Sequence, residues 1–208
     1  MERYQVLFLV FIAVLAPSSS NSNIFGGQCS KNDEEVDQCL LVRFNNFINH
    51  LKSGSPELNI EQVWSDLDTY QFQLTLSIPH ISATARYRSS GVLLLVRASG
   101  GGDYWGEYEN IKAKVYFRGE PYKRKGKTYL KLKQLKLDFS VKNIKMGVEN
   151  LENSNSVLQA ALNLFINTNS QELLKEMKPQ LKRDLAEKMS RFLDKILEKI
   201  PYDDWIVD

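Results

Sequence analysis

The segment Lys125-Gly126-Lys127-Thr128 comes nearest to a catalytic motif in this chain, because it has the form of the end of a phosphate-binding loop. A complete loop of that kind carries a further glycine five residues earlier, and its backbone N–H groups surround a phosphate. That position is Pro121, which has no N–H, and no strand-to-helix pattern follows. The segment is more simply interpreted as the tip of a hairpin.

Other catalytic motifs are also incomplete or absent. Gly100-Gly101-Gly102 lacks the spacing of a dinucleotide-binding loop, and the sequence has no Gly-x-Ser-x-Gly nucleophile elbow. The two histidines, His50 and His80, stand at no metal-ligand spacing from a cysteine. We therefore predict that the protein is not an enzyme, has no metal site and needs no cofactor.

Cys29 and Cys39 are the two cysteines of the chain, enough for one local disulfide in an oxidising compartment. A bridge between them closes a loop of about ten residues and contributes on the order of 2–3 kcal/mol in the chain-entropy model. It would pin the N-terminal segment onto the helix that follows.

Residues 1–20 have the pattern of a secretory signal peptide. Arg3 supplies a positive charge, Val6 to Ala16 is uninterruptedly apolar, and small polar residues follow Pro17. The apolar run is too short to cross a bilayer core of about 30 Å, although an uncleaved membrane anchor is the alternative. We predict cleavage near Asn21, secretion to the extracellular space and one domain over residues 21–208, whose composition of 43% apolar and 25% charged residues is ordinary.

Residues 169–200 have the periodicity of one long amphipathic helix. Asn169 would cap its first turn, Pro179 would kink it and Pro201 would end it. At about 1.5 Å per residue such a helix is roughly 45 Å long. Its apolar stripe requires a large covering partner and contains Leu173, Met177, Leu181, Leu185, Met189, Phe192, Ile196 and Ile200.

The region before this helix changes from helical to strand periodicity. Residues 33–51 predict a helix, and residues 71–78 alternate as a half-buried strand. Pro79 is expected to interrupt that strand, which resumes from Ile81 on the opposite parity. Gly91 predicts a turn, and Gly100–Gly102 predicts a loop.

A second pair of strands follows. Residues 111–117 alternate between apolar and mostly basic side chains, a polar turn is predicted from Gly119 to Lys127, and the next strand covers residues 130–141. A change of parity near Gln134 predicts a bulge, and a short helix is predicted over residues 156–165. The fold class is therefore α+β, with a bent antiparallel sheet around the long helix, and an apolar space between them would suit a hydrophobic ligand.

Several short motifs follow one another at defined spacing: Ala85-Arg86-Tyr87, Gly91-Val92-Leu93-Leu94, Asn150-Leu151, Leu164-Phe165-Ile166-Asn167-x-Asn169, Leu173-Leu174-Lys175-Glu176-x-Lys178-Pro179-x-Leu181 and Ile200-Pro201-Tyr202-Asp203. In this order they resemble the insect juvenile hormone-binding and takeout proteins. Cys29 and Cys39 fall where that family has its N-terminal disulfide.

The resemblance implies a super-roll, in which a highly curved antiparallel sheet wraps the long C-terminal helix, as in the tubular lipid-binding superfamily. It also implies a secreted carrier of a juvenile hormone-like terpenoid or fatty acid-like lipid, in haemolymph or sensory fluid. Between Pro56 and Tyr70 this chain is shorter than the family pattern, which has additional sheet there.

The residues expected to contact the ligand are the inward-facing apolar residues of the strands and of the long helix, although ordinary core packing is the alternative for each. They are Phe72, Leu74, Leu76, Ile81, Ala85, Tyr87, Leu93, Leu95, Val115, Phe117, Leu135, Leu137, Phe139, Leu181, Leu185 and Phe192.

A basic stripe between Lys112 and Lys145 supports a second function, docking on anionic lipid or an acidic partner with little or no ligand cavity. Its densest part is Lys123, Arg124, Lys125 and Lys127. Lysines that guard a sheet against edge pairing are the alternative. Aromatic residues are too sparse in the stripe for nucleic-acid binding. We also expect the protein to be a monomer.

Overall fold

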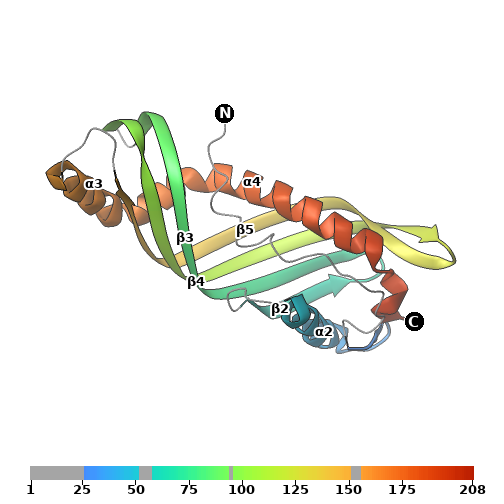
Figure 1. Ribbon diagram of the computed structural model, residues 1–208. Coiled ribbons are helices and arrows are strands. Elements are labelled where there is room, and N and C mark those ends of the chain that lie inside the picture. Colours follow the sequence, from blue (N-terminus) through green and yellow to red (C-terminus); the bar gives the residue numbers. More distant parts are fainter. Residues whose placement is uncertain (1–25, 52–57, 94–95, 151–155) are drawn as a thin grey trace. The chain divides into compact units, whose positions relative to one another are not determined.

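The computed structural model describes residues 26–51, 58–93, 96–150 and 156–208 (Figure 1). In chain order, the elements are β1 (Cys29–Ser30), α2 (Val36–Leu51), β2 (Asn59–Asp66), β3 (Gln71–Leu93), β4 (Val96–Arg124), β5 (Lys127–Glu149), α3 (Ser156–Thr168), α4 (Ser170–Lys199), the 3-10 helix η1 (Tyr202–Asp204) and β6 (Ile206–Val207). One sheet has the order β2-β3-β4-β5, and β1 pairs with β6 in parallel. The predicted α+β class, with a large antiparallel sheet and a long C-terminal helix, is confirmed.

The two main predicted helices are present. The N-terminal one begins at Val36, three residues later than predicted, because the Asp33 carboxylate accepts a hydrogen bond from the Glu35 N–H at 2.9 Å in the turn before it. The C-terminal helix α4 passes through Pro179 and ends just before Pro201. Of the helices that the structure describes, none is both long and apolar enough to span a membrane.

The predicted cap of α4 is wrong. The side-chain Nδ2 of Asn169 donates to the Phe165 carbonyl at 2.8 Å, which places this amide at the end of α3. The Asn169 N–H bonds to the same carbonyl, and the Asn169 carbonyl accepts from Leu173. Because these backbone bonds continue the helical pattern across the junction, α4 has no isolated first turn for a side chain to cap.

The three long strands run through every glycine predicted to break them. Gly91 lies inside β3, and Gly100–Gly102 lie inside β4, so the predicted turn and loop are wrong. Glycine fits a strand where another group approaches the backbone closely. Gly147 of β5 shows this directly, since a Cβ there would come within 2.8 Å of the Trp105 ring.

Pro79 also lies within a continuous strand and does not interrupt β3. The missing N–H of proline is tolerated on a strand side that has no partner. In the described part of the sheet, pairing of β3 with β2 runs from Asp66↔Gln71 to Asn59↔Ser77 and ends just before Pro79.

The hairpin between β4 and β5 is tighter than the predicted turn from Gly119 to Lys127. Its connection is Lys125-Gly126, with φ angles of 50° and 80°. Two central residues with positive φ match the right-handed twist of the flanking strands, and glycine adopts this conformation without steric cost. The strands therefore extend almost to the tip (Figure 1).

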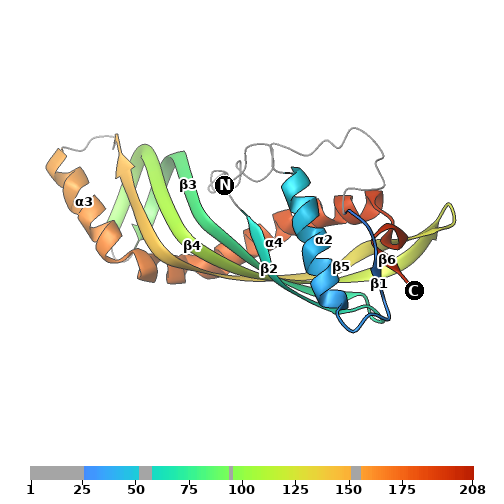
Figure 2. The same cartoon turned by 90° about the horizontal axis from the view of Figure 1, so that it is seen from below.

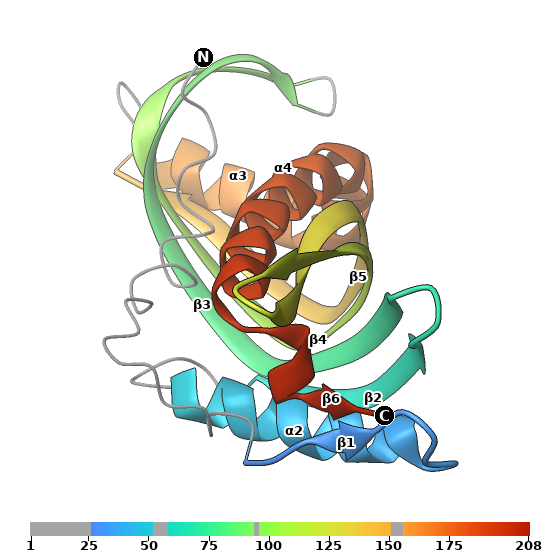
Figure 3. The same ribbon diagram turned by 90° about the vertical axis from the view of Figure 1, so that its right-hand side faces the viewer.

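The chain forms two compact units. The first unit contains Pro79–Ile111 and Val141–Pro179, and the second contains the described residues up to Ile78 together with Lys112–Ser140 and Gln180–Asp208. The main hydrophobic core lies in the second unit, where α2 lies beside β2 (Figure 2) and β6 lies beside β1 (Figure 3).

All three long strands change the parity of their buried residues close to the limits between the units. Buried positions are even in β3 up to Ile78 and odd at Ala83, and they change from even at Tyr108 to odd at Ile111 in β4. In β5 they become even from Ile144. The sequence predicted the change after Pro79 and a further change near Gln134 of β5, where two successive residues are exposed. It did not predict the change between Tyr108 and Ile111 in β4 or the change before Ile144 in β5.

Candidate functional site

Two residues predicted to contact a ligand form the centre of the aromatic core of the second unit. The rings of Phe72 and Phe117 are stacked with centroids 5.0 Å apart, and Trp205 lies 5.4 Å from Phe72. Phe72 is 0% exposed and Phe117 is 3% exposed. Phe44 of α2 packs on Trp205 from another side. The closeness of these rings is that of a packed core.

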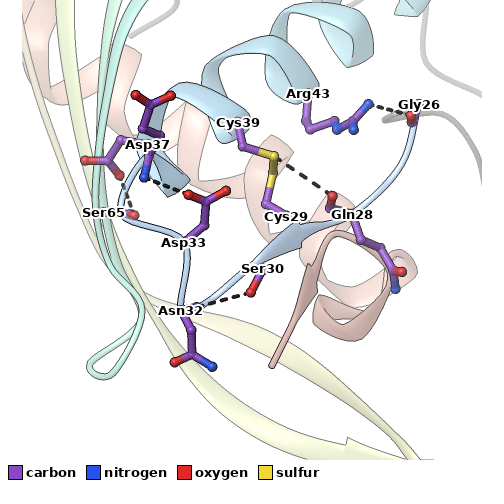
Figure 4. Close-up of a disulfide and its surroundings, with 11 residues drawn as sticks. Gly26, Gln28, Cys29, Ser30, Asn32, Asp33, Asp37, Cys39, Arg43 and Ser65 are labelled. Carbon is purple, nitrogen blue, oxygen red and sulfur yellow. Dashed lines mark hydrogen bonds between the residues drawn. A yellow bond between two sulfur atoms is a disulfide. The ribbon is translucent and has the colours of Figure 1, made fainter.

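The predicted disulfide is confirmed (Figure 4), and its Cys29 belongs to the same buried cluster as Phe72 and Trp205. It joins Cys29 of β1 to Cys39 of α2, with Cα atoms 5.9 Å apart. The Cys29 N–H donates to the Trp205 carbonyl at 2.9 Å. The disulfide and the backbone hydrogen bonds of the N-terminal segment therefore hold the N-terminal strand, the N-terminal helix and the C-terminal segment together.

The second half of α4 presents an apolar stripe that is only half-buried. Leu185 and Met189 pack against the core of the second unit, yet both keep accessible surface, as do Leu181, Phe192 and Ile196. Within α4, which the structure describes completely, the fully buried apolar residues are Leu173 and Leu197. Between Leu181 and Ile196 the stripe retains apolar surface that a further apolar group could cover.

The strand residues of the second unit divide in the same way. Leu76, Val115 and Leu137 are buried, whereas Leu74, Leu135 and Phe139 are half-buried. These side chains are aliphatic or aromatic. They can cover the apolar surface of a ligand, but they carry no group that could catalyse a reaction.

The remaining predicted ligand contacts belong to the first unit. Ile81 and Ala85 of β3 are half-buried. The side chains of Tyr87 and Leu93, and the whole of Leu95, lie outside the described residues.

A pair of tyrosines in the first unit was not predicted from the sequence. The hydroxyl groups of Tyr104 and Tyr108 are hydrogen-bonded to each other, and that of Tyr104 also donates to Met146 Sδ at 3.7 Å. Burial raises the pKa of both phenols, and the neighbouring Tyr108 adds to the rise at Tyr104. Both therefore stay neutral hydrogen-bonding groups among apolar neighbours. The spacing Tyr104-x-Gly106-x-Tyr108, which puts both rings on one side of a strand, is the sequence signal that could have revealed them.

The predicted basic tip is exposed, but most of its cations have intramolecular partners. Lys123 Nζ donates to the Thr128 hydroxyl at 2.8 Å, and Lys127 Nζ lies 2.7 Å from Asp204 Oδ1. Arg124 donates to the Glu198 carbonyl at 2.6 Å and lies over the Tyr129 ring. Lys125, at the turn itself, is in no ion pair with a described residue.

Comparison with known protein families identifies the class to which this fold belongs. Residues 60–207 match the family model of the haemolymph juvenile hormone binding protein. That match covers more than half of the chain, so the protein belongs to this family. Members of the family are carriers of hydrophobic ligands rather than enzymes.

Two individual proteins are also similar to this chain. It is 27% identical over 133 residues to the circadian clock-controlled protein daywake of Drosophila melanogaster, a match that covers 64% of this chain and 51% of daywake. The chain thus spans about half the length of that curated relative. The crystal structure of Takeout 1 from Epiphyas postvittana matches with a TM-score of 0.66 at 22% identity, covering 73% of this chain and 70% of Takeout 1. The structural match shows a shared fold.

Proposed function

We propose that this protein is a secreted carrier that binds one small hydrophobic ligand, such as a juvenile hormone-like terpenoid or a fatty acid-like lipid. The observation that carries the proposal is the half-buried stripe of α4 in the second unit. A helix face that packs toward a core and still keeps apolar surface gains free energy when a ligand covers it. Family membership supports the same function.

The contacts proposed for the ligand are the half-buried residues, because the fully buried ones are already covered by protein. In the second unit these are Leu74, Leu135, Phe139, Leu181, Leu185 and Phe192. Phe72, Leu76, Val115, Phe117 and Leu137 support them from the core.

The affinity of such a carrier follows from apolar burial. Each CH₂ group buried contributes roughly 0.8 kcal/mol, so a ligand of about fifteen carbons reaches micromolar to nanomolar affinity after the costs of association. The ligand is bound and released unchanged.

Secretion is part of the proposal. The disulfide suits an oxidising compartment, and residues 1–20 carry the pattern of a signal peptide. Protein isolated from culture medium should begin near Asn21, which N-terminal sequencing would establish. A mature chain that keeps Val6 to Ala16 would contradict this part of the proposal.

Titration of the purified mature protein with an environment-sensitive apolar fluorophore tests the binding function. We expect saturable uptake at about one fluorophore per chain, and displacement by a terpenoid ester or a long-chain fatty acid. A broad panel of terpenoids and lipids that fails to displace the fluorophore would overturn the carrier function.

A further inference from the structure

One side of the sheet in the second unit carries an exposed tryptophan beside a group of unpaired cations. Trp64 of β2 lies directly opposite Gln73 of β3, and directly opposed residues of antiparallel strands share one side of a sheet. Gln73 is exposed, whereas its neighbour Phe72 is fully buried. Trp64 therefore lies on the side of the sheet that faces away from the core, and it is 48% exposed.

The same side continues across β4. Gln71, two residues before Gln73, accepts a hydrogen bond of 2.6 Å from the Tyr116 hydroxyl. Because side chains alternate along a strand, Lys114 and Arg118 project on the same side as Tyr116. Both are exposed.

On β5 this side carries three more cations. Lys136 Nζ lies 5.7 Å from the centre of the Tyr116 ring. Lys133 Nζ lies 2.6 Å from Glu120 Oε2, and Glu120 shares the parity of Tyr116 on β4. Lys131, two residues before Lys133, points the same way. We call Trp64, Lys114, Tyr116, Arg118, Lys131 and Lys136 the cationic face.

Charge on this face is not balanced by acids of the chain. Lys112 pairs with Glu61 at 3.0 Å, and Lys133 pairs with Glu120, so neither carboxylate is left to pair with another cation. The four cations of the cationic face are Lys114, Arg118, Lys131 and Lys136. None of them forms an ion pair with a described residue. Asp138 on β5 pairs with Lys182. Asp66 at the end of the face accepts a hydrogen bond from the Thr69 hydroxyl and keeps its negative charge, so the four cations outnumber it. The four cations are thus available to an external anion.

The combination of residues favours one kind of partner. Lys and Arg near an anionic bilayer gain free energy from its surface potential, and indole and phenol rings favour the headgroup level of a membrane. An acidic protein would pair with the cations but gives no reason for an exposed tryptophan beside them. We propose that the cationic face docks on the surface of an anionic phospholipid membrane, with Trp64 entering the headgroup region.

The docking surface lies within one compact unit and does not depend on the binding of a carried ligand. It also differs from the hairpin tip, whose cations Lys123, Arg124 and Lys127 are engaged with groups of the same chain. Membrane docking would bring the protein to the place where a hydrophobic molecule enters or leaves a bilayer.

Co-sedimentation with vesicles of phosphatidylcholine and phosphatidylserine in equal parts tests the charge requirement. Replacing Lys114, Arg118 and Lys131 with glutamine should weaken vesicle binding on the order of a hundredfold. Replacing Lys145, Lys195 and Lys199 with glutamine removes the same charge from exposed positions outside the face and should change binding by no more than a fewfold. Equal loss in both triple variants would overturn the proposal, as would binding to pure phosphatidylcholine that equals binding to the mixed vesicles.

Fluorescence of Trp64 tests the geometry in the unmodified protein. Vesicles that contain brominated phosphatidylcholine with phosphatidylserine should quench the fluorescence, and most of the quenching should be lost in Trp64→Phe. Of the other two tryptophans, Trp205 is 3% exposed in the core, and Trp105 of the first unit is half-buried with its ring against Gly147. Absence of quenching in vesicle-bound protein would overturn the proposed orientation. Binding to polyglutamate without binding to the anionic vesicles would show an acidic polypeptide as the partner and refute membrane docking.

Discussion

The ring of Phe72 on β3 stacks on the ring of Phe117 on β4, with an interplanar angle of 19° and both side chains buried. This pair separates two roles that apolar residues of the sheet play. Residues in the aromatic core stabilise the fold, whereas the half-buried residues around them are left to contact a ligand. The two roles predict different consequences of substitution.

Phe117→Ala should lower the free energy of unfolding by about 3–5 kcal/mol, because it leaves a cavity beside the ring of Phe72. Urea denaturation followed by circular dichroism measures the change. Val42→Ala, at a residue of α2 that is 49% exposed, serves as the control and should stay within about 0.5 kcal/mol of the unmodified protein. Similar losses in both variants would show that the Phe72–Phe117 pair is not the centre of the core.

Phe192→Ala should weaken the binding of the apolar fluorophore by roughly tenfold, because the half-buried ring of α4 no longer covers the ligand. Its effect on unfolding should be smaller than that of Phe117→Ala. The matched control is Leu164→Ala, at an apolar residue of α3 that is 71% exposed and is expected to leave affinity unchanged. Unchanged affinity in Phe192→Ala would remove this part of α4 from the proposed site.

Asn167→Ala should destabilise the first unit by about 1–3 kcal/mol, because two backbone groups of β5 lose their partner. The Asn167 side chain accepts from the Met146 N–H at 3.1 Å and donates to the Met146 carbonyl at 2.7 Å. Asn163 makes the same pair of bonds with Val148, so α3 satisfies the edge of β5 as a neighbouring strand would.

Hydrogen exchange of the Met146 amide reports this interaction directly, and exchange should accelerate in Asn167→Ala. Asn143→Ala removes an exposed amide from the same strand and is the control. An unchanged exchange rate at Met146 in Asn167→Ala would show that the edge is held by other contacts.

Asp203 should make the free energy of unfolding of the second unit depend on pH in the acidic range. Burial raises the pKa of its carboxyl group, but hydrogen bonds from the Thr128 N–H and hydroxyl, together with nearby Lys123 and Lys127, outweigh burial and hold the pKa below its ordinary value of 3.8. The Thr128 N–H donates to Asp203 Oδ2 at 2.7 Å. Since the folded pKa is the lower one, the stabilisation is present above about pH 4 and is lost as the pH falls through the folded pKa.

Asp203→Asn should therefore lower stability at neutral pH and flatten the dependence of unfolding free energy on pH below the ordinary value of 3.8. Urea denaturation at a series of pH values measures both effects. A variant with the same acid dependence as the unmodified protein would show that Asp203 does not carry this linkage.

The periodicity of the sequence was sufficient to predict the two main helices and the presence of strands with alternating side chains. Residues 170–199 and 36–51 form helices because each segment has an apolar stripe wide enough to bury on one face. The disulfide followed from there being one pair of cysteines. These features depend on residues close together in the chain.

Features that depend on distant partners were not predictable from one strand alone. Gly91 and Gly100–Gly102 indicate breaks until β3 and β4 are known to run through them, and Asn169 resembles a cap until α3 is known to end beside it. The cationic face required the register of β2 and β3, which brings Trp64 opposite Gln73. The spacing of Tyr104 and Tyr108 puts both rings on one side of a strand, but their burial and the hydrogen bond between their hydroxyl groups depend on the packing around them.

Native mass spectrometry of the protein isolated from its own tissue tests the carrier function most directly, because a retained ligand adds its mass to the folded chain. We predict a species that carries one small hydrophobic molecule and releases it on denaturation. Protein that is ligand-free as isolated, and that also takes up no terpenoid or fatty acid when these are added, would contradict the account.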